Sequence, residues 1–305
     1  RMDGIINVRK EKGFTSFDVV AKLRGILKMK KIGHTGTLDP DAEGVLPVCI
    51  GKATRVCDLL TDKDKVYEAV MLLGKETDTQ DMTGTILKES EVNLSIEEVK
   101  QCIESFVGEY AQIPPMYSAL KVNGKKLYEL ARAGKEVERQ ARHVDLPSIE
   151  ILEIRLPVVK FRVECSKGTY IRSLCADIGG KLGCGGTMQS LVRTRVGEFR
   201  LTDALTLTQL QELRDTDRLE EALLPTDRIF ADFNAVHVEE KWRKLIDNGN
   251  AFYPGQTMEQ TTYPAGEWVR VYREDDSFVG IYAYDGVKEW YKPMKIFPSN
   301  TESRK

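Results

Sequence analysis

The sequence predicts a mixed α/β (α+β) fold, with helices flanking a mixed sheet, rather than a doubly wound parallel sheet. Strand-like segments are interspersed with few helical ones, and some are close enough to form hairpins, as 149–156 and 158–165 are. The sequence changes in character near Phe233, beyond which short strand-like runs and turn signals dominate. We therefore expect a first domain over 1–233 and a small β-rich domain over 234–305.

The elements of the N-terminal part follow from apolar patterns. Residues 4–8 form an apolar run typical of a buried strand, and Thr15 or Ser16 is placed to cap a helix. A loop rich in Gly, Thr and Asp covers 33–44, before a strand over 45–50 and a short helix from Thr54. The apolar positions of the first helix have a helical period: Val19, Val20, Leu23, Ile26 and Leu27.

The rest of the chain is assigned in the same way. Ser95 and Glu98 form a capping box, which opens a helix that ends near Phe106. We expect a hairpin tip and a short helix standing off the body over 121–142. The other expected elements are strands over 65–74, 149–156, 158–165, 187–197, 268–272 and 278–284, and helices over 168–182, 207–224 and 239–248.

Composition narrows the class of protein. The chain has 305 residues, 41% hydrophobic and 30% charged, which excludes a disordered, collagen-like or coiled-coil protein. Its 45 basic and 47 acidic residues give a net charge of −2, which argues against nonspecific DNA coating but leaves room for a local basic face. No apolar run approaches the ~18 residues that span a bilayer, and the start lacks a signal-peptide pattern. We expect a cytoplasmic protein without a membrane partner.

The spacing of cysteines and acids argues against a metal site. The six cysteines form no CxxC pair and the three histidines are far apart, so we expect reduced thiols and no structural zinc. Asp78, Asp81 and Gly84 resemble a calcium loop only faintly, because the spacing is wrong and no closing Glu follows. We expect a structural turn there and no metal.

The stretch over 33–44 is the most informative one. Gly33, Gly36 and Gly44 with a central Asp39-Pro40 make a tight, ordered loop, but no Gly-Lys-Ser/Thr ending follows, so it is not a phosphate-binding P-loop. Taken alone, Asp39 before Pro40 is most simply a turn residue.

The loop, GHTGTLDPDAEG, resembles the signature GHTG-x-LDP-x-A-x-G of the bacterial tRNA pseudouridine-55 synthases, the TruB class. The resemblance continues in family order over about 4–232, and the tail is similar to the RNA-binding PUA barrel. One departure is Lys10-Glu11-Lys12-Gly13, which lacks the proline of the family's Lys-Pro-x-Gly. The other matching segments are 65–69 (KVYEA), 77–84 (TDTQDMTG), 114–121 (PPMYSALK), 168–174 (GTYIRSL) and 191–197 (LVRTRVG).

The resemblance implies the fold, reaction and partner. The fold would be that of pseudouridine synthases, with a mixed, largely antiparallel sheet flanked by helices, followed by a PUA-like β-barrel. The reaction would convert uridine to pseudouridine at position 55 in the T-arm of tRNA, by base flipping and an Asp nucleophile. This isomerisation transfers no outside group and has no redox change, so no cofactor is expected, and we expect a monomer.

The resemblance also assigns the candidate site residues. Asp39 would be the nucleophile and Arg172 its cationic partner, whereas from local sequence Arg172 could equally be a surface residue. Tyr67 would stack on the uracil, although strand tyrosines more often pack in a core. The other substrate-binding candidates are Leu191 as an apolar wall, Tyr170 beneath the site, and His34 as a planar replacement for the flipped base.

Two basic regions are candidates for phosphate contacts. The tail of the first helix carries Lys28, Lys30 and Lys31, and the insert over about 121–145 carries Arg139 and Arg142. In the family this insert closes over the T-arm. On charge alone, an ordinary solvated loop is the simpler interpretation of the insert.

Two other functions stay open. The first is a pseudouridine synthase that acts inside a guide-RNA particle, which the insert argues against. The second is a chaperone that folds tRNA by binding it, which would not require Asp39. The sequence leaves open whether the nucleophile attacks uracil C6 or ribose C1′.

Overall fold

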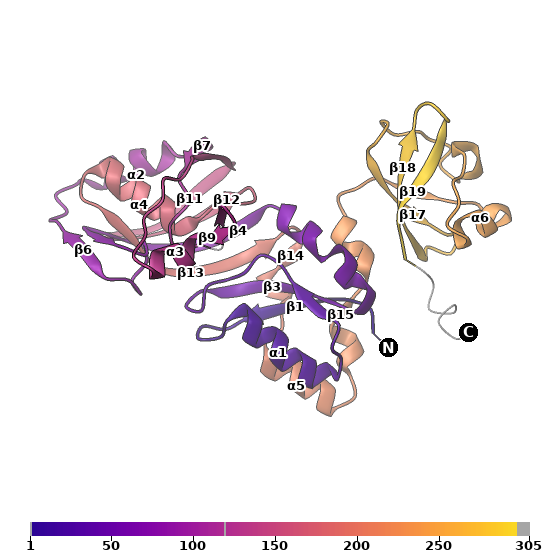
Figure 1. Ribbon diagram of the computed structural model, residues 1–305, viewed down its shortest axis with the longest axis horizontal. Coiled ribbons are helices and arrows are strands. Elements are labelled where there is room, and N and C mark those ends of the chain that lie inside the picture. Colours follow the sequence, from indigo (N-terminus) through magenta and orange to yellow (C-terminus); the bar gives the residue numbers. More distant parts are fainter. Residues whose placement is uncertain (1, 119, 298–305) are drawn as a thin grey trace. The chain divides into compact units, whose positions relative to one another are not determined.

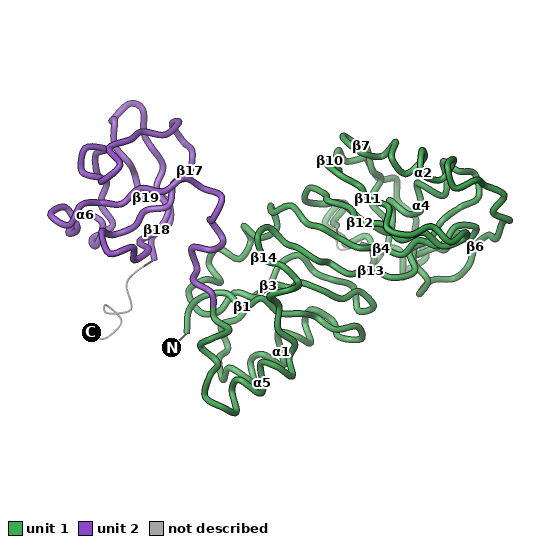
Figure 2. Tube along the Cα trace, turned by 180° about the vertical axis from the view of Figure 1, so that it is seen from behind, with its two compact units in different colours: residues 1–223 green, residues 224–305 purple. Residues whose placement is uncertain are grey.

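The computed structural model describes residues 2–118 and 120–297. The chain divides into two compact units, residues 1–223 and residues 224–305, which Figure 2 colours separately. The sequence places the domain boundary after Phe233, whereas this division follows Leu223. The first unit carries the candidate site residues and is described first.

A nine-stranded sheet forms the frame of the first unit (Figure 1). Two short strands lie off its main path, β2 (Ile32–His34) beside β3 and β14 (Phe199–Arg200) beside β13. The main path runs in the order β11 (Ser148–Arg155), β12 (Val158–Cys165), β4 (Lys65–Leu73), β13 (Gly186–Val196), β3 (Glu43–Ile50), β1 (Gly4–Lys10) and β15 (Leu223–Leu224).

The sheet is mixed, as predicted. Strands β11, β12, β4 and β13 pair antiparallel in turn, and β1 pairs antiparallel with β3. Strands β13 and β3 instead run parallel, with Arg193 opposite Gly44. Gly44 has φ +124° there, and a Cβ would lie 2.1 Å from the Arg193 carbonyl oxygen, so this junction requires glycine. The prediction of a mixed, largely antiparallel sheet flanked by helices is confirmed.

Two hydrophobic cores cover the two halves of this sheet. Helices α1 (Ser16–Leu27) and α5 (Leu207–Asp215) pack with β1 and β3, and Figure 1 shows them side by side. Helices α2 (Ile96–Glu104) and α4 (Ile171–Leu182) pack with β4, β12 and β13. The parallel β13–β3 pair is the junction between the two halves.

The predicted helix starts follow local side-chain chemistry. Thr15 caps α1 by accepting from the Asp18 N–H at 2.9 Å, and the Asp18 carboxylate accepts from the Thr15 N–H. Ser95 and Glu98 form the expected capping box at α2. These boxes satisfy N–H groups that a helix start otherwise leaves without partners.

Among the described residues of the first unit, three two-stranded sheets stand outside the main sheet. The hairpin and helix expected over 121–142 are present as β8, β9 and α3, although Ala119 of the matching segment lies outside the described residues. The paired strands are β5 (Lys75–Thr77) with β6 (Ile86–Glu89), β7 (Gly108–Gln112) with β10 (Arg142–Leu146), and β8 (Lys121–Val122) with β9 (Lys125–Lys126), which precedes α3 (Leu127–Arg132).

Two predicted helices were too long. The helix expected over 207–224 ends at Asp215, because Asp217 adopts φ +55°, a left-handed conformation that terminates the helix. The helix expected from 168 begins at Ile171, since Gly168 has φ +76° and Tyr170 is extended. The helix expected from Thr54 is a 3₁₀ helix, η1 (Gly51–Asp62).

The second unit contains a four-stranded sheet, and its predicted strands are confirmed. The predicted helix over 239–248 is a 3₁₀ turn, η5 (Glu240–Trp242), followed by α6 (Arg243–Asp247). Its final residues, 298–305, lie outside the described range. The sheet order is β16 (Ala235–His237), β17 (Trp268–Tyr272), β18 (Phe278–Asp285) and β19 (Trp290–Ile296).

Candidate active site

Asp39 lies in the loop between β2 and β3, and this loop is tied to the start of α1. The Ser16 hydroxyl, which is buried, accepts from the Leu38 N–H at 3.1 Å and donates to the Leu38 carbonyl at 3.3 Å. On the other side of Asp39, the Gly13 N–H donates to the Pro40 carbonyl at 2.8 Å. The main-chain groups of both neighbours of Asp39, Leu38 and Pro40, are therefore held by hydrogen bonds, one to a side chain and one to the main chain.

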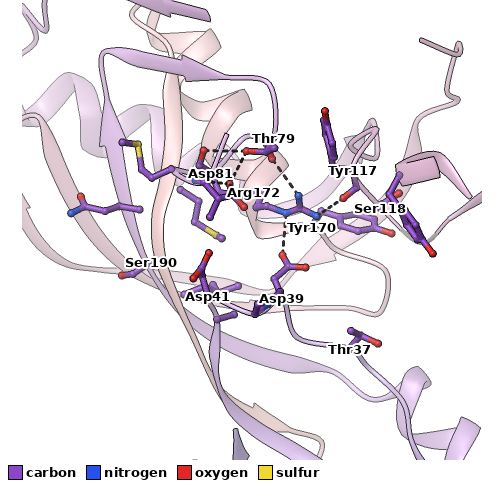
Figure 3. Close-up of a pocket in the computed structure, with 18 of the residues that line it drawn as sticks. Thr37, Asp39, Asp41, Thr79, Asp81, Tyr117, Ser118, Tyr170, Arg172 and Ser190 are labelled. Carbon is purple, nitrogen blue, oxygen red and sulfur yellow. Dashed lines mark hydrogen bonds and ion pairs between the residues drawn. The ribbon is translucent and has the colours of Figure 1, made fainter. Parts of the chain in front are cut away.

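Arg172 faces Asp39 from the first turn of α4 (Figure 3). Its Nε lies 3.4 Å from Asp39 Oδ2, and its Nη atoms donate to the Thr79 carbonyl at 3.3 Å and the Tyr117 carbonyl at 2.8 Å. The Arg172 side chain is 10% exposed and that of Asp39 is 49% exposed. The guanidinium is thus fixed and buried, while the carboxylate can reach a substrate.

A small cavity of about 130 Å³ brings five of the six predicted catalytic and substrate-binding residues together: Asp39, Tyr67, Tyr170, Arg172 and Leu191. It lies beside a larger cleft of about 930 Å³, which Asp39, Tyr170, Arg172 and Leu191 also line. The carboxylate, the guanidinium, two aromatic rings and an apolar wall therefore meet at one place.

Tyr67 reaches this cavity from β4 and is almost buried. It lies opposite Arg193 in the antiparallel β13–β4 pair, so both side chains are on the same face of the sheet. Burial raises the pKa of Tyr67, while the charge of Arg193 and a side-chain hydrogen bond with it act in the opposite direction. The phenol is therefore protonated at neutral pH.

His34, the sixth predicted residue, lines neither the cavity nor the cleft. It ends β2, is half-buried, and within the described residues its buried Nδ1 has no hydrogen-bond partner. Burial, and then the charge of Arg193, lower the pKa of His34. The imidazole is therefore an uncharged planar ring at pH 7.

The predicted phosphate contacts lie outside the cleft. Lys28, Lys30 and Lys31 are exposed, at the end of α1 and in the turn after it. Arg142 is exposed on β10, whereas Arg139 is half-buried and donates to the Pro114 carbonyl at 3.0 Å. Arg139 therefore anchors the insert and is less available to RNA than its charge suggests.

Besides Arg172, two further basic residues line the cleft, Lys12 and Arg132, and the sequence interpretation did not single them out. Lys12 lies in the departure from the family's Lys-Pro-x-Gly segment, and Arg132 ends α3 of the insert. The Arg132 guanidinium lies 5.1 Å from the ring centre of Tyr128, which also lines the cleft. Which basic residue of the insert lines the cleft depends on the direction of its side chain on the short helix α3, and a run of charges in the sequence does not reveal that direction.

Arg193 is a third residue that was not singled out. It is 2% exposed, and its Nε donates to the Val45 carbonyl at 2.9 Å. Its Nη1 lies 3.5 Å from where a Cβ would stand on Gly36, in the loop that carries Asp39, and Gly36 has φ +69°. Alternation along the strand predicted over 187–197 could have placed Arg193 on the same face as the site residue Leu191, two positions earlier.

The acidic turn over 77–84 uses its carboxylates internally. Asp81 Oδ1 accepts from the Thr83 N–H at 3.0 Å and the Thr79 hydroxyl at 2.6 Å, and Asp78 Oδ1 accepts from the Thr85 N–H at 2.7 Å. Among residues 2–118 and 120–297, no cluster of three or more His, Cys, Asp or Glu side chains is arranged to hold a metal ion. Within those same ranges, no helix is long and apolar enough to cross a membrane.

Similar solved structures define the class of protein. The chain matches one in a structure of an H/ACA RNP bound to a substrate RNA containing 2′-deoxyuridine, with TM-score 0.75, 26% identity, and coverage of 97% of this chain and 85% of that chain. It also matches one in a Cbf5-Nop10-Gar1 complex, with TM-score 0.75, 29% identity, and the same coverage. The fold is that of a pseudouridine synthase.

Sequence comparison gives the family. Residues 24–171 match the TruB family pseudouridylate synthase N-terminal domain, and residues 172–231 match the tRNA pseudouridylate synthase B C-terminal domain. A tRNA pseudouridine synthase B from Lachnoclostridium phytofermentans is 54% identical over 97% of this chain and 100% of its own length. One from Alkaliphilus oremlandii is 50% identical over 92% of both chains. The chain belongs to the TruB family of pseudouridylate synthases.

Proposed function

We propose that this enzyme converts uridine 55 in the T-arm of tRNA to pseudouridine, with Asp39 as the nucleophile. The observation that carries the proposal is the pair of Asp39 and Arg172, 3.4 Å apart, at a cavity of about 130 Å³. The names of its relatives, tRNA pseudouridine synthase B, support the choice of tRNA. A tRNA substrate also supports the expected cytoplasmic location, and we keep the expectation of a monomer.

The reaction breaks the bond from ribose C1′ to uracil N1 and forms one from C1′ to C5. The proton on C5 is lost and N1 gains one, so atoms balance without an outside group or redox partner. The Asp39 carboxylate supplies the covalent step. Arg172, fixed by two main-chain carbonyls, pairs with that carboxylate and holds it in place.

The remaining cavity residues accommodate the extruded base. Tyr67 presents a ring for stacking, Leu191 an apolar wall, and Tyr170 supports the site from the start of α4. His34 lies outside the cavity and is uncharged, which suits a planar ring that fills the space left in the RNA stack.

Contacts with flanking RNA must offset the cost of extruding a base, which is about a few kcal/mol. We propose that Arg132, Arg142 and the lysines at 28, 30 and 31 bind phosphates, and that the second unit contributes as a PUA-like RNA-binding domain. The barrel form of that unit stays a prediction.

A guide-RNA-particle enzyme is the alternative with a specific observation behind it, since two solved relatives come from such complexes or their proteins. The curated relatives named tRNA pseudouridine synthase B match at higher identity, one over its full length, and favour the stand-alone reaction. A tRNA chaperone without catalysis would retain binding but make no product.

The test is incubation of the protein with an unmodified tRNA transcript, without guide RNA, followed by mapping of pseudouridine by position. We expect product at the T-arm uridine alone. Asp39→Asn should bind tRNA within about twofold of wild type and lose product formation by at least about 10³-fold, because it removes the nucleophile. Asp203→Asn, an exposed residue on the turn η2 (Leu201–Asp203), is the control and should keep wild-type turnover.

Each outcome discriminates between the functions. Substantial turnover by Asp39→Asn would reject Asp39 as nucleophile. Tight tRNA binding without product by the wild-type protein would favour the chaperone, and product only with a guide RNA would favour the particle enzyme.

A further inference from the structure

The start of α4 carries two site residues but has no side-chain cap. Its N-cap residue, Tyr170, makes no capping hydrogen bond through its own side chain, and Arg172 follows two positions later. Serine, threonine, asparagine or aspartate commonly fixes this position in a helix. The place of Tyr170 and Arg172 must therefore be set by groups outside the helix.

Gln112, the last residue of β7, supplies such groups. Its Oε1 accepts from the Tyr170 N–H at 2.8 Å, and its Nε2 donates to the Tyr170 carbonyl at 2.9 Å. The side chain is 2% exposed. One buried amide thus pairs with both main-chain groups of Tyr170, as a neighbouring strand would.

The segment around Gln112 holds α4 at two further points. The Tyr110 hydroxyl donates to the Asp177 carboxylate in the second turn of α4, and the Tyr117 carbonyl accepts from Arg172 Nη2 at 2.8 Å. The same segment leads into the basic insert, which begins with β8 at Lys121. Of these three contacts, the one from Gln112 is made by a buried, uncharged side chain. It binds the main chain of Tyr170, two residues before Arg172.

We propose that Gln112 is a positioning residue for the isomerisation: its amide fixes the Tyr170 main chain and thereby the orientation of the Tyr170 ring and of the Arg172 guanidinium toward Asp39. This rests on the proposed function. Gln112 lines neither the cavity nor the cleft, so it acts through its neighbours. A misplacement of about 1 Å at a reacting group can lower a rate by about 10²-fold.

Two substitutions of similar size separate this role from simple support of the fold. Gln112→Met removes both hydrogen bonds. Gln112→Glu keeps an acceptor for the Tyr170 N–H, but its ionised form sets a second oxygen against the Tyr170 carbonyl. The protonated acid donates there instead and restores the glutamine pattern. Burial favours the protonated acid at position 112, whereas the cations of Arg142, directly opposite in the β7–β10 pair, and of Arg172 favour the ionised one. Tyr110 and Asp177, which bond to each other, are the other ionisable groups on the adjoining elements.

The experiment measures single-turnover pseudouridine formation at saturating tRNA, the Kd for tRNA, and the melting temperature. Gln112→Met should lose about 10- to 100-fold in rate, with Kd within about twofold of wild type. Gln112→Glu should regain rate relative to wild type as pH falls from 8 to 5.5, at constant Kd. Gln101→Met, an exposed glutamine on α2, is the control and should match wild type.

A folded Gln112→Met protein with the wild-type rate, or a Gln112→Glu deficit that does not change with pH, would overturn the proposal. If Gln112→Met does not fold, the Gln112→Glu pH series decides alone. If the wild-type protein itself makes no pseudouridine, the proposed function fails. That outcome is distinct from a failure of the role of Gln112, in which the wild type and Gln112→Met have the same rate.

Discussion

At the scale of single residues, one buried cation influences the ionisation of its neighbours. Arg193 opposes protonation of His34, and after burial it is the next cause that lowers the pKa of Lys65, to about 8. It also acts against the effect of burial on Tyr67. Because Arg193 is 2% exposed, water screens these interactions little. Arg193 therefore adds to the effect of burial in keeping His34 neutral and opposes the effect of burial on Tyr67, although it does not line the cavity.

His34 gives a prediction of pH dependence. Its pKa is lowered in the folded state, so the unfolded state binds the proton more tightly. The neutral imidazole contributes its full share to the free energy of unfolding above the unfolded-state pKa of 6.5. That contribution is lost as pH falls through the lower pKa of the folded state. Between pH 7.5 and 5, the free energy of unfolding should fall more for wild type than for His34→Gln, by urea denaturation at each pH.

The control for this prediction is His143→Gln, which removes an exposed histidine on β10. It should keep the wild-type dependence on pH. An identical loss of stability on acidification in His34→Gln and wild type would contradict the effect of His34.

At the scale of elements, β13 shapes the cavity. Its pairing with β4 shifts register between Met188 and Ser190 and again between Arg193 and Arg195. The segment between these shifts carries Leu191 into the cavity and places Arg193 opposite Tyr67. Bulges re-aim side chains near functional sites, and here they bracket the residues that β13 contributes.

Substitutions in the insert test the proposed contacts between its arginines and the phosphates of tRNA. Arg142→Gln and Arg132→Gln should each weaken tRNA binding and reduce the slope of log K against log salt by about 0.7–0.9, because each removes about one phosphate contact. Titrations from low to moderate salt measure this. Arg155→Gln, an exposed arginine on β11 paired with Glu153, is the matched control.

Arg139 differs from these two. Arg139→Gln should lower the melting temperature of the protein, because it removes the hydrogen bond to the Pro114 carbonyl. An unchanged salt slope in both Arg132→Gln and Arg142→Gln would show that these residues do not bind phosphate.

At the scale of the whole molecule, the site lies where the two halves of the sheet meet in the first unit. The Asp39 loop enters β3, while β4 and β13 supply Tyr67 and Leu191 from the other half. Within the second unit, Phe230 is fully buried and stacks on Phe278 at 6.0 Å. Phe230 therefore belongs to the packing of the second unit, whereas the sequence places the boundary after Phe233.

Two truncations test this division. A fragment that ends at Leu224 keeps β15 and should fold, with weaker tRNA binding than the full chain. A fragment that ends at Phe233 removes Phe278 from Phe230 and Trp268 from Phe233, which exposes both rings, and should be less soluble. Melting curves and light scattering measure both, and an insoluble 1–224 fragment would show that the core needs residues beyond it.

Local chemistry made much of the fold predictable. The capping boxes at Thr15 and Ser95 and the alternation along β4 and β12 act between residues close in sequence, and each appears where expected. Helix α5 was predicted too long, because the left-handed conformation of Asp217 has no strong sequence signal. The family motifs also indicated Asp39 and Arg172, and the assignment of their chemical roles stays a prediction.

The sequence alone determined the order of the elements, the family and the choice of Asp39 and Arg172 as candidate site residues, because motifs and periodicity are properties of short stretches of chain. Only the tertiary structure decided that Gln112 pairs with the Tyr170 main chain, that Arg193 is buried beside the Asp39 loop, and that Arg132 rather than Arg139 lines the cleft. These outcomes depend on strands and loops distant in sequence being packed together, which fixes the direction of a side chain as well as its identity.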